Sequence, residues 1–328
     1  MPSARIIQFS LIFACLLVVA LRPGPSIAQI ARTEVHPIQT TTPTDQQFLT
    51  GASDAKATTI AGMLRIPRLG TDRLPAAILV HGSGGMGGNV DYWSQQLTGS
   101  GIATFAIDYV TGRGIENTNA DQGKLPRLAE IIDIYKVLAL LGAHPRIDRN
   151  RIAVMGFSRG AQAALYSSLI RFQKMYGPEG LNFSAYLTFY TPCNTRYIDD
   201  EIVSDKPIRL FHGAADDYVP VAPCRSYVER LRNAGKDVVL TEYAGAYHVF
   251  DNPLLKETPT AFPTWQTSRR CTLVEESPGR IVNAETKQVF TYADPCVELG
   301  PHIAYNAAAL SQSTQAVKEF LSQTFKLK

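Results

Sequence analysis

The sequence predicts an α/β protein in which a mostly parallel, twisted sheet carries helices on both faces. Short runs that are apolar throughout alternate along the chain with stretches in which apolar residues recur at helical spacing. A strand covered on both faces has no polar side, so such runs are typical of parallel strands between helix layers. The alternation of the two patterns favours one continuous sheet of this kind.

Six apolar runs are predicted as strands, at residues 76–80, 103–107, 152–155, 186–190, 208–211 and 238–241. Helices are predicted over residues 125–141, 158–170, 224–233 and 305–325. The first of these helices ends before Gly142 and Pro145, which are typical helix terminators. In such sheets, binding sites form at the C-terminal ends of the strands.

The composition is that of an ordinary globular protein. The 328 residues are 45% hydrophobic and 19% charged, with a formal charge of +3. We expect one domain over residues 59–328, with a cysteine-containing insertion at about 251–301, and a loosely ordered leader over residues 29–58. The near-neutral charge gives no reason to expect a nucleic-acid partner or an acidic membrane surface.

The N-terminus has the pattern of a secretory signal peptide over residues 1–28. Arg5 precedes an apolar run over residues 6–21, and small residues at Ser26 and Ala28 follow a break at 22–25. Cleavage is expected after Ala28. The alternative is a membrane anchor, but the run is shorter than the roughly 20 residues needed to span a bilayer. We therefore expect a periplasmic or secreted protein without stable membrane association.

Removal of that segment leaves four cysteines in an oxidising compartment: Cys193, Cys224, Cys271 and Cys296. No metal-binding spacing is present, so two disulfides are favoured over a metal site. Three pairings are possible. We favour Cys271 with Cys296, because they bracket two short β-like runs with a turn signal at 278–279, and Cys193 with Cys224, because both lie near one edge of the expected cleft.

The segment Gly156-Phe157-Ser158-Arg159-Gly160 lies between a predicted strand and a predicted helix. This is the context of a nucleophile elbow, in which a strained turn exposes the serine hydroxyl. Glycines two residues to either side let the strand and the helix approach closely. Without this context, the same pattern is usually a loop. Ser158 is therefore the predicted nucleophile.

A serine nucleophile needs a base and a group that orients the base, and in this kind of sheet the acid follows the nucleophile and the histidine comes last. His248 lies in a glycine-containing loop after the last predicted strand and is the predicted base, ahead of His212 and His302. Asp216 follows the preceding strand and is preferred as the acid. Its neighbour Asp217 is the alternative, and is otherwise expected to face solvent or cap the next helix.

Two backbone N–H groups are expected to bind the oxyanion. One belongs to Arg159, directly after the nucleophile, and the other to Ser83 in the loop His81-Gly82-Ser83-Gly84-Gly85, with Gly84 as the reserve. His81 is expected to brace this loop.

The same loop also fits a dinucleotide-binding fingerprint. Gly82, Gly84 and Gly87 follow a strand, and Asp108 ends the next strand, where it could hold a ribose. A secreted dinucleotide-binding protein is thus one alternative, disfavoured by the expected export and by the chain that precedes the strand. A catalytically inert binding relative is another, but such a protein would be expected to lack a member of the serine, aspartate and histidine set.

Taken as a set, the loop at 81–85 and the segments 156–160, 212–220 and 245–250 resemble the dienelactone hydrolase family. The resemblance spans about residues 60–251 and the last helix, and implies the α/β-hydrolase fold with Ser158, Asp216 and His248 as catalytic residues. The archetypes of the family have cysteine at the elbow, so Ser158 favours a broader activity on carboxylic esters or lactones.

We therefore expect an acyl-enzyme mechanism on a small-molecule ester or lactone, with no cofactor and no metal. Trp93, Tyr109 and Arg113 lie on loops after predicted strands and are candidates for the wall of the substrate pocket, although exposed aromatic and arginine side chains usually have no special role.

Overall fold

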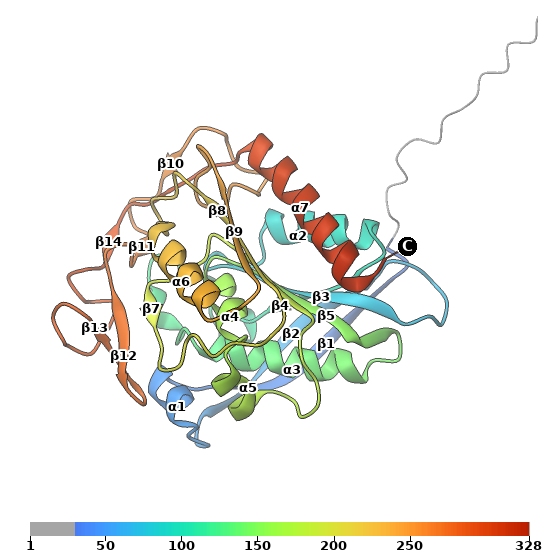
Figure 1. Cartoon of the computed structure of the whole chain (residues 1–328), viewed down its shortest axis with the longest axis horizontal. Helices are drawn as coiled ribbons and strands as arrows, with labels where there is room; N and C mark the ends of the chain where they lie inside the picture. The colour runs from blue at the N-terminus through green and yellow to red at the C-terminus, as the bar shows by residue number, and fades with distance from the viewer. Residues whose placement is uncertain (1–29, 328) are drawn as a thin grey trace, which may run out of the picture.

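The computed structural model describes residues 30–327 (Figure 1). The expected signal peptide at residues 1–28 lies outside this range. Within the range, none of the helices combines the length and the apolar character that a membrane crossing requires.

One eight-stranded sheet organises the chain, with the strand order β1-β2-β4-β3-β5-β6-β8-β9. Its strands are β1 (Arg32–Thr42), β2 (Lys56–Ile66), β3 (Leu74–Val80), β4 (Ala103–Asp108), β5 (Ile147–Phe157), β6 (Ala185–Phe189), β8 (Ile208–Gly213) and β9 (Val238–Tyr243). The strands from β4 to β9 are parallel, whereas β1 and β2 are antiparallel to their neighbours. All six predicted strands lie in the parallel part, which confirms the predicted fold class.

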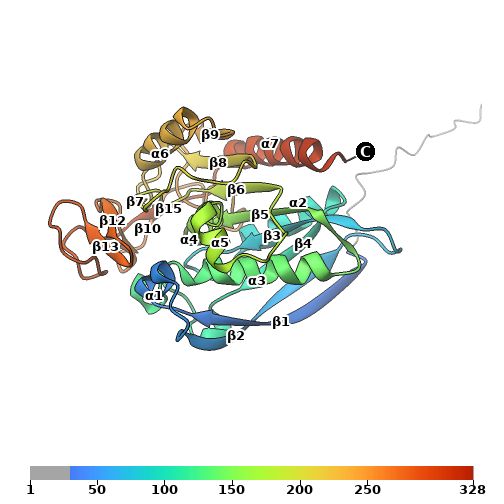
Figure 2. The ribbon, with the colours of Figure 1, turned by 60° about the horizontal axis from the view of Figure 1, so that its bottom comes forward.

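The helices form two layers, as Figures 1 and 2 show. They are α2 (Gly88–Gly99) and α7 (Ala307–Phe325) on one face, and α3 (Ala129–Ala143), α4 (Arg159–Tyr166), α5 (Ile170–Tyr176) and α6 (Ala222–Asn233) on the other. Successive side chains of each strand pack alternately against the two helix layers: Ile78 packs against the layer that contains α3, and Leu79 against the layer that contains α2. The sheet is therefore buried on both faces, as its apolar strands require.

The first described residues form regular secondary structure, contrary to expectation. The leader predicted as loosely held over residues 29–58 instead forms β1, the short helix α1 (Asp45–Thr50) and the start of β2. β1 pairs with β2 along its whole length, and a capping box between Thr44 and Gln47 begins α1. β1 is an edge strand with one exposed face and many Thr and Gln residues, so its sequence carries little apolar periodicity.

Two predicted helices also have different bounds. The helix predicted over residues 125–141 begins only at Ala129, after the 3₁₀ turn η2 (Gln122–Lys124), while a second 3₁₀ turn, η1 (Thr111–Arg113), follows β4. The helix predicted over 158–170 ends at Tyr166, and α5 begins at Ile170. Ser167 and Ser168 bond to carbonyl groups three residues back, which competes with continuation of the helix.

The predicted insertion forms a group of short strands beside the C-terminal ends of the sheet strands. They are β10 (Thr260–Ala261), β11 (Gln266–Thr267), β12 (Leu273–Ser277), β13 (Arg280–Asn283), β14 (Glu298–Leu299) and β15 (His302–Ile303), and β12 also pairs with β7 (Thr195–Arg196). β10 pairs with β15 and β11 with β14, so the segment folds back on itself.

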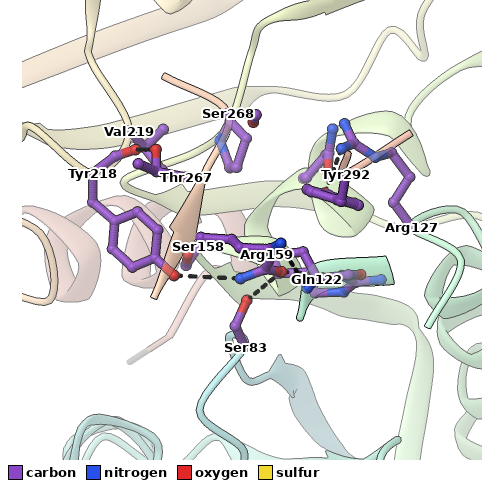
Figure 3. A pocket seen from close by; sticks show the side chains of 13 residues that line it. Ser83, Gln122, Arg127, Ser158, Arg159, Tyr218, Val219, Thr267, Ser268 and Tyr292 are labelled. Atoms are coloured by element: carbon purple, nitrogen blue, oxygen red, sulfur yellow. Dashed lines mark hydrogen bonds between the residues drawn. The ribbon is translucent and has the colours of Figure 1, made fainter. Parts of the chain in front are cut away.

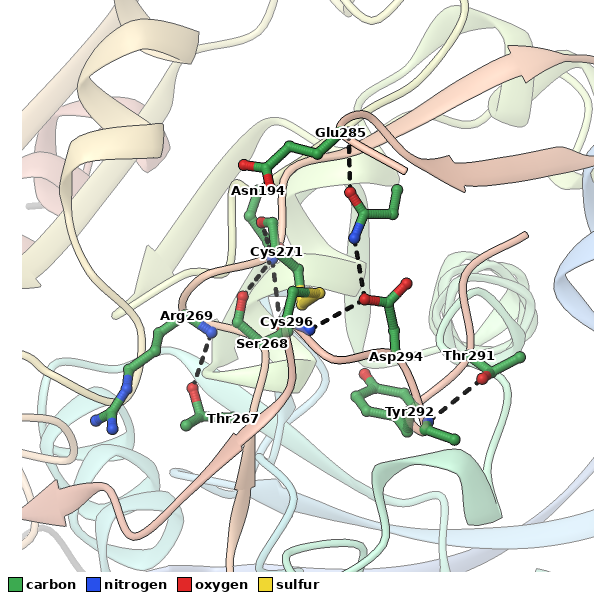
Figure 4. Close-up of a disulfide and its surroundings, with 12 residues drawn as sticks. Asn194, Thr267, Ser268, Arg269, Cys271, Glu285, Thr291, Tyr292, Asp294 and Cys296 are labelled. Atoms are coloured by element: carbon green, nitrogen blue, oxygen red, sulfur yellow. Dashed lines mark hydrogen bonds between the residues drawn. A yellow bond between two sulfur atoms is a disulfide. The ribbon is translucent and has the colours of Figure 1, made fainter. Parts of the chain in front are cut away.

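Two disulfides hold this part of the molecule. One joins Cys193 to Cys224 and the other joins Cys271 to Cys296, the pairing that the sequence favours. Figure 4 shows the second bridge beside Asp294, which accepts a hydrogen bond from the Cys296 N–H at 3.0 Å. The bridge closes the β12–β13 hairpin and its return to β14.

Replacing Cys271 and Cys296 together with alanine is expected to lower the free energy of unfolding by roughly 3 to 4 kcal/mol, because the closed loop restricts the unfolded chain. The cysteines are 25 residues apart. Urea unfolding of the wild type and of the double variant, both without reductant so that the Cys193–Cys224 bridge stays intact, measures the effect. A change below about 1 kcal/mol would contradict the estimate.

Candidate active site

Ser158 occupies a strained turn between β5 and α4. Its φ of 54° and ψ of −118° lie outside the usual regions for a residue with a side chain. A Cβ at Gly156 would lie 2.2 Å from the Gly160 carbonyl oxygen, and one at Gly160 would lie 2.3 Å from the carbonyl oxygens of Val80 and His81. Only glycine fits at both positions, so the sequence motif has the steric cause expected of an elbow.

Ser158, His248 and Asp216 form a continuous hydrogen-bonded chain. His248 Nε2 lies 2.8 Å from Ser158 Oγ, and His248 Nδ1 lies 2.7 Å from Asp216 Oδ2. His248 and Asp216 are buried. The three residues follow β5, β9 and β8 respectively, at the C-terminal ends of parallel strands. The structure therefore brings together the three residues singled out from the sequence.

The Asp216 carboxylate is held by its own loop. Its Oδ1 accepts hydrogen bonds from the N–H groups of Tyr218 at 2.9 Å and Val219 at 2.8 Å, which leaves Oδ2 for His248. His212, the alternative base, is buried beside this loop with Nε2 2.8 Å from the Val219 carbonyl oxygen. Burial lowers the pKa of His212, which keeps the ring neutral as a structural group.

Asp217 does not cap α6, and its side chain is only partly exposed to solvent, at 36%. Its carboxylate accepts a hydrogen bond from the His302 backbone N–H at 3.0 Å and lies 2.8 Å from His302 Nδ1. Arg269 of the insertion lies 3.5 Å away. Asp217 therefore binds the insertion, whose fold could not be read from local sequence signals.

Two tyrosine rings enclose the His248 imidazole. The ring centroids of Tyr190 and Tyr218 each lie 4.6 Å from that of His248. The His248 carbonyl oxygen accepts a hydrogen bond from the Ala304 N–H at 3.2 Å. His248 is thus fixed by packing on both faces and by the insertion behind it.

A buried polar network behind His248 was not found from the sequence. The Tyr190 hydroxyl donates to Asp251 Oδ1 at 3.0 Å and accepts from Asn89 Nδ2 at 3.0 Å. Trp93 Nε1 donates to Asp251 Oδ2 at 2.7 Å. Burial raises the pKa of Asp251 to about 6, in spite of these two donors. The only sequence signal was the position of Asp251 three residues after His248.

The raised pKa of Asp251 predicts a pH-dependent contribution to stability. The contribution is fully present below the usual carboxyl pKa near 3.8 and is lost as the pH rises through about 6. The free energy of unfolding of the wild type, relative to Asp251→Asn, should therefore fall by roughly 2 kcal/mol between pH 4 and pH 7. Urea unfolding of both proteins across this range measures the difference. A pH-independent difference would contradict it.

The predicted oxyanion donors lie on either side of Ser158. Arg159 is the first residue of α4, so its N–H has no partner within the helix. Ser83 lies in the turn after β3, and within residues 30–327 neither backbone N–H donates to a protein acceptor. The Ser83 hydroxyl donates to Gln122 Oε1 at 3.0 Å. Both amides are thus free for an oxyanion.

His81 braces the loop as expected. Its ring stacks on Tyr109 with centroids 3.9 Å apart, and its Nδ1 lies 2.7 Å from the Gly82 carbonyl oxygen. Burial lowers its pKa to about 4, so the ring is neutral at physiological pH. A Cβ at Gly82 would lie 3.1 Å from the Ser158 Cβ, so contact with the elbow accounts for this glycine. Asp108, the proposed ribose ligand, accepts from the N–H groups of its own loop.

None of the three candidate pocket residues lines either cavity at Ser158. Trp93 lies on α2 and is buried beneath Asp251, Tyr109 is buried against His81, and Arg113 forms a buried ion pair with Asp133 at 2.8 Å. The cavity walls come largely from the insertion, from Asn119, Gln122 and Arg127 between β4 and α3, and from the loop after β3. Of these, the sequence connected only the loop after β3 with the site.

Two cavities meet at Ser158. The first, here called the polar cavity because most of the residues that line it are polar, has a volume of about 40 Å³ and lies beside Arg159, Gln122 and Tyr292 (Figure 3). The second is largely apolar, about 330 Å³, and reaches Phe262 and Trp265 of the insertion. Ser83, Ser158 and Tyr218 line both cavities.

The Arg159 side chain forms the base of the polar cavity. Its guanidinium pairs with the buried Glu130, and it also donates to carbonyl groups of Gln122 and Leu125. Burial raises the pKa of Glu130 to about 7, opposed by Arg159, and the carboxylate in turn raises the pKa of Arg159 against the effect of burial. The pair fixes η2 against the elbow helix.

One group of side chains within residues 30–327 has the composition of a metal site: Glu34 and His36 on β1, and His144 after α3. Both Nε2 atoms lie beside Glu34 Oε2, at 3.0 and 3.3 Å. His144 Nδ1 accepts from the Arg146 N–H, so its Nε2–H donates to the carboxylate. The group is accounted for as hydrogen bonds, and it has no contact with the cavities at Ser158.

A serine, an aspartate and a histidine that follow strands of a mostly parallel sheet in this chain order define the α/β-hydrolase class. Residues 60–325 match the model of the dienelactone hydrolase family, and the chain belongs to that family. This confirms the resemblance recognised in the sequence. The chain is accordingly a carboxylic ester hydrolase.

Solved structures share this fold. A dienelactone hydrolase-like promiscuous phosphotriesterase from metagenomic libraries superposes with a TM-score of 0.56 at 17% identity, over 89% of this chain and 98% of its own. A putative dienelactone hydrolase from Klebsiella pneumoniae gives 0.55 at 14% identity, over 88% and 99%. An uncharacterized protein of Caenorhabditis elegans is 27% identical over 42% of this chain and 78% of its own length.

Proposed function

We propose that the protein hydrolyses carboxylic esters or lactones through an acyl-enzyme intermediate on Ser158, with His248 as the base and Asp216 orienting it. The observation that carries the proposal is the unbroken chain from Ser158 Oγ through His248 to Asp216, with contacts of 2.8 and 2.7 Å. The dienelactone hydrolase family supports ester hydrolysis, and the chain supplies serine as the nucleophile.

In the first half-reaction, Ser158 Oγ attacks the ester carbonyl carbon while His248 Nε2 takes the hydroxyl proton. The carbonyl oxygen becomes an oxyanion, which the N–H groups of Ser83 and Arg159 are positioned to bind. As the carbon–oxygen bond to the alcohol breaks, His248 returns the proton to the leaving oxygen. In the second, His248 takes a proton from water, the hydroxide attacks the acyl carbon, and Ser158 Oγ leaves with the proton.

We also propose that the protein acts outside the cytoplasm. The two disulfides support this placement, because such bonds persist mainly in oxidising compartments.

A fluorophosphonate probe tests the proposed nucleophile. The probe is expected to add once to the native protein, with the adduct on the peptide that contains Ser158, and to abolish ester hydrolysis in proportion to labelling. The denatured protein and Ser158→Ala serve as controls and should not react. An adduct on another residue that also abolishes activity would overturn the proposal.

A further inference from the structure

The two cavities at Ser158 differ in one respect that matters for catalysis. His248 lines the apolar cavity, and it is not among the residues that line the polar one. The imidazole must protonate the oxygen of the leaving alcohol, so that oxygen has to lie on the His248 side of the tetrahedral carbon. The acyl substituent then lies on the opposite side of the tetrahedral carbon, away from His248. The apolar cavity therefore receives the alcohol, and the polar cavity receives the acyl group.

We infer that the site selects esters of a short acyl group that carries a hydrogen-bond acceptor, joined to a bulky apolar alcohol. This inference rests on Ser158 and His248 acting as proposed above. It assigns one half of the substrate to each cavity and names the residues that recognise it.

Size limits the acyl group. The polar cavity of about 40 Å³ has space for a few non-hydrogen atoms, given that one water needs roughly 10 to 15 Å³ by this measure. Long alkyl chains do not fit there. Most of the residues that line it are polar, and Gln162 is the clearest case: it is buried, its Nε2 has no hydrogen-bond partner, and its side chain bonds to no other residue within 30–327. An unpaired buried amide is costly unless a ligand satisfies it.

Arg127 adds a cationic donor to the same wall. Its side chain is buried, and its guanidinium donates to the Tyr292 hydroxyl and, at 3.4 Å, to Thr195 Oγ1. Within the described part of the chain it forms no ion pair, whereas Arg159 is paired with Glu130. Asp45 interacts with this cation without a direct ion pair, and the rings of Phe290 and Tyr292 each lie 5.2 Å from its guanidinium carbon. No carboxylate of residues 30–327 contacts the guanidinium, so a ligand with acceptor oxygens can pair with it. Gln162 and Arg127 together therefore recognise an acceptor on the acyl group.

The apolar cavity fits a ring-sized alcohol. Its volume of about 330 Å³ exceeds the roughly 150 Å³ that is enough to hold benzene. Phe262 and Trp265 stack with centroids 4.0 Å apart at its wall, and Leu255 and Ile303 complete the apolar surface. A bulky apolar alcohol would displace water from this surface, whereas a methyl alcohol would leave most of it exposed.

A pair of isosteric esters tests the acyl assignment. Benzyl methoxyacetate and benzyl butanoate differ only by an ether oxygen in place of a methylene. The ratio of their kcat/KM values, methoxyacetate over butanoate, is expected to fall about tenfold in Gln162→Leu, because one hydrogen bond is lost. Comparing variant with wild type cancels the intrinsic reactivity of the two esters. Gln173→Leu, on α5 and outside both cavities, is the matched control and should keep the wild-type ratio.

The reverse orientation has its own test. With 2-methoxyethyl and butyl phenylacetate, the ether oxygen lies in the alcohol, and Gln162→Leu should leave their kcat/KM ratio unchanged. A Gln162-dependent ratio for this pair, or a ratio for the first pair that Gln162→Leu does not alter, overturns the inference. Trp265→Ala should lower the preference for benzyl over methyl methoxyacetate about tenfold, and an unaltered preference also counts against it.

Benzyl hydrogen malonate separates a charged from an uncharged acceptor. If the wild type has a higher kcat/KM for the malonate than for the methoxyacetate, and Arg127→Met abolishes this difference, the acceptor is a carboxylate. If the wild type has no such preference, the acceptor is a neutral oxygen. If the two esters that carry an acceptor and benzyl butanoate are hydrolysed with equal kcat/KM, the inference is overturned. Each ester is also assayed with Ser158→Ala. Hydrolysis that survives this change overturns the proposed function itself. Hydrolysis that depends on Ser158 but shows no acyl preference overturns only the present inference.

Discussion

Ser158→Ala is expected to lower kcat/KM for ester hydrolysis by about a thousandfold or more while the protein stays folded. The hydroxyl is the only group lost, and its one hydrogen-bond partner is His248 Nε2 at 2.8 Å. The backbone N–H of residue 158 still donates to the Phe189 carbonyl oxygen at 2.9 Å, and alanine has the same Cβ as serine in the strained turn. Neither the elbow nor the sheet depends on the hydroxyl.

The measurement is steady-state kinetics with a short-chain ester, together with circular dichroism and thermal unfolding to confirm that the variant is folded. Ser167→Ala is a suitable control, because this buried serine lies after the same helix and its hydroxyl bonds only to the Ala164 carbonyl oxygen. It should retain most of the activity. Substantial activity in a folded Ser158→Ala protein would remove Ser158 from the mechanism.

Asparagine at Asp216 is expected to lower kcat by about 10³- to 10⁴-fold, because an amide at this position favours the wrong imidazole tautomer and does not stabilise the imidazolium. Asp216 Oδ2 lies 2.7 Å from His248 Nδ1, while Oδ1 is engaged by the loop amides. The same change at Asp217 should have a far smaller effect on kcat. Asp217 contacts His302 and Arg269, so its loss should act mainly on the stability of the insertion and on KM.

The two aspartates are adjacent, so they form a matched pair for this experiment. Both variants are compared by kcat, KM and the pH dependence of kcat, since a role in holding His248 should alter the pH profile and a role in holding the insertion should not. Similar losses of kcat at the two positions, or a larger loss at Asp217, would refute the assignment of the acid.

The sequence predicted the central sheet and the meeting of Ser158, Asp216 and His248 because these depend on local signals. The parallel strands are largely apolar, and each of the three residues follows such a strand, so the parallel arrangement places them at one edge. The glycines at 156 and 160 add a steric requirement that is visible in the residue types alone.

The cavity walls could not be predicted because they depend on tertiary contacts between distant segments. Trp265 and Phe262 reach the site only because β10 and β11 pair with strands more than 30 residues later. Arg127 lies in the turn before α3 and Gln162 lies on α4, and nothing in their local sequence marks an unpaired group. Helix α2 was missed although Val90, Trp93 and Leu97 have helical spacing, since the surrounding glycines and polar residues hide the pattern.

The insertion is joined to both loops that hold the imidazole in place. Asp217, next to the acid, binds His302, the Thr267 hydroxyl donates to the Tyr218 carbonyl oxygen at 2.6 Å, and Ala304 binds the carbonyl group of His248. For protein engineering, this divides the segment into positions with different tolerance. Libraries that alter the alcohol preference can vary Phe262 and Trp265 freely, whereas a transplanted insertion from a relative has to reproduce these three attachments, or it will disturb the alignment of the imidazole along with the shape of the cavity.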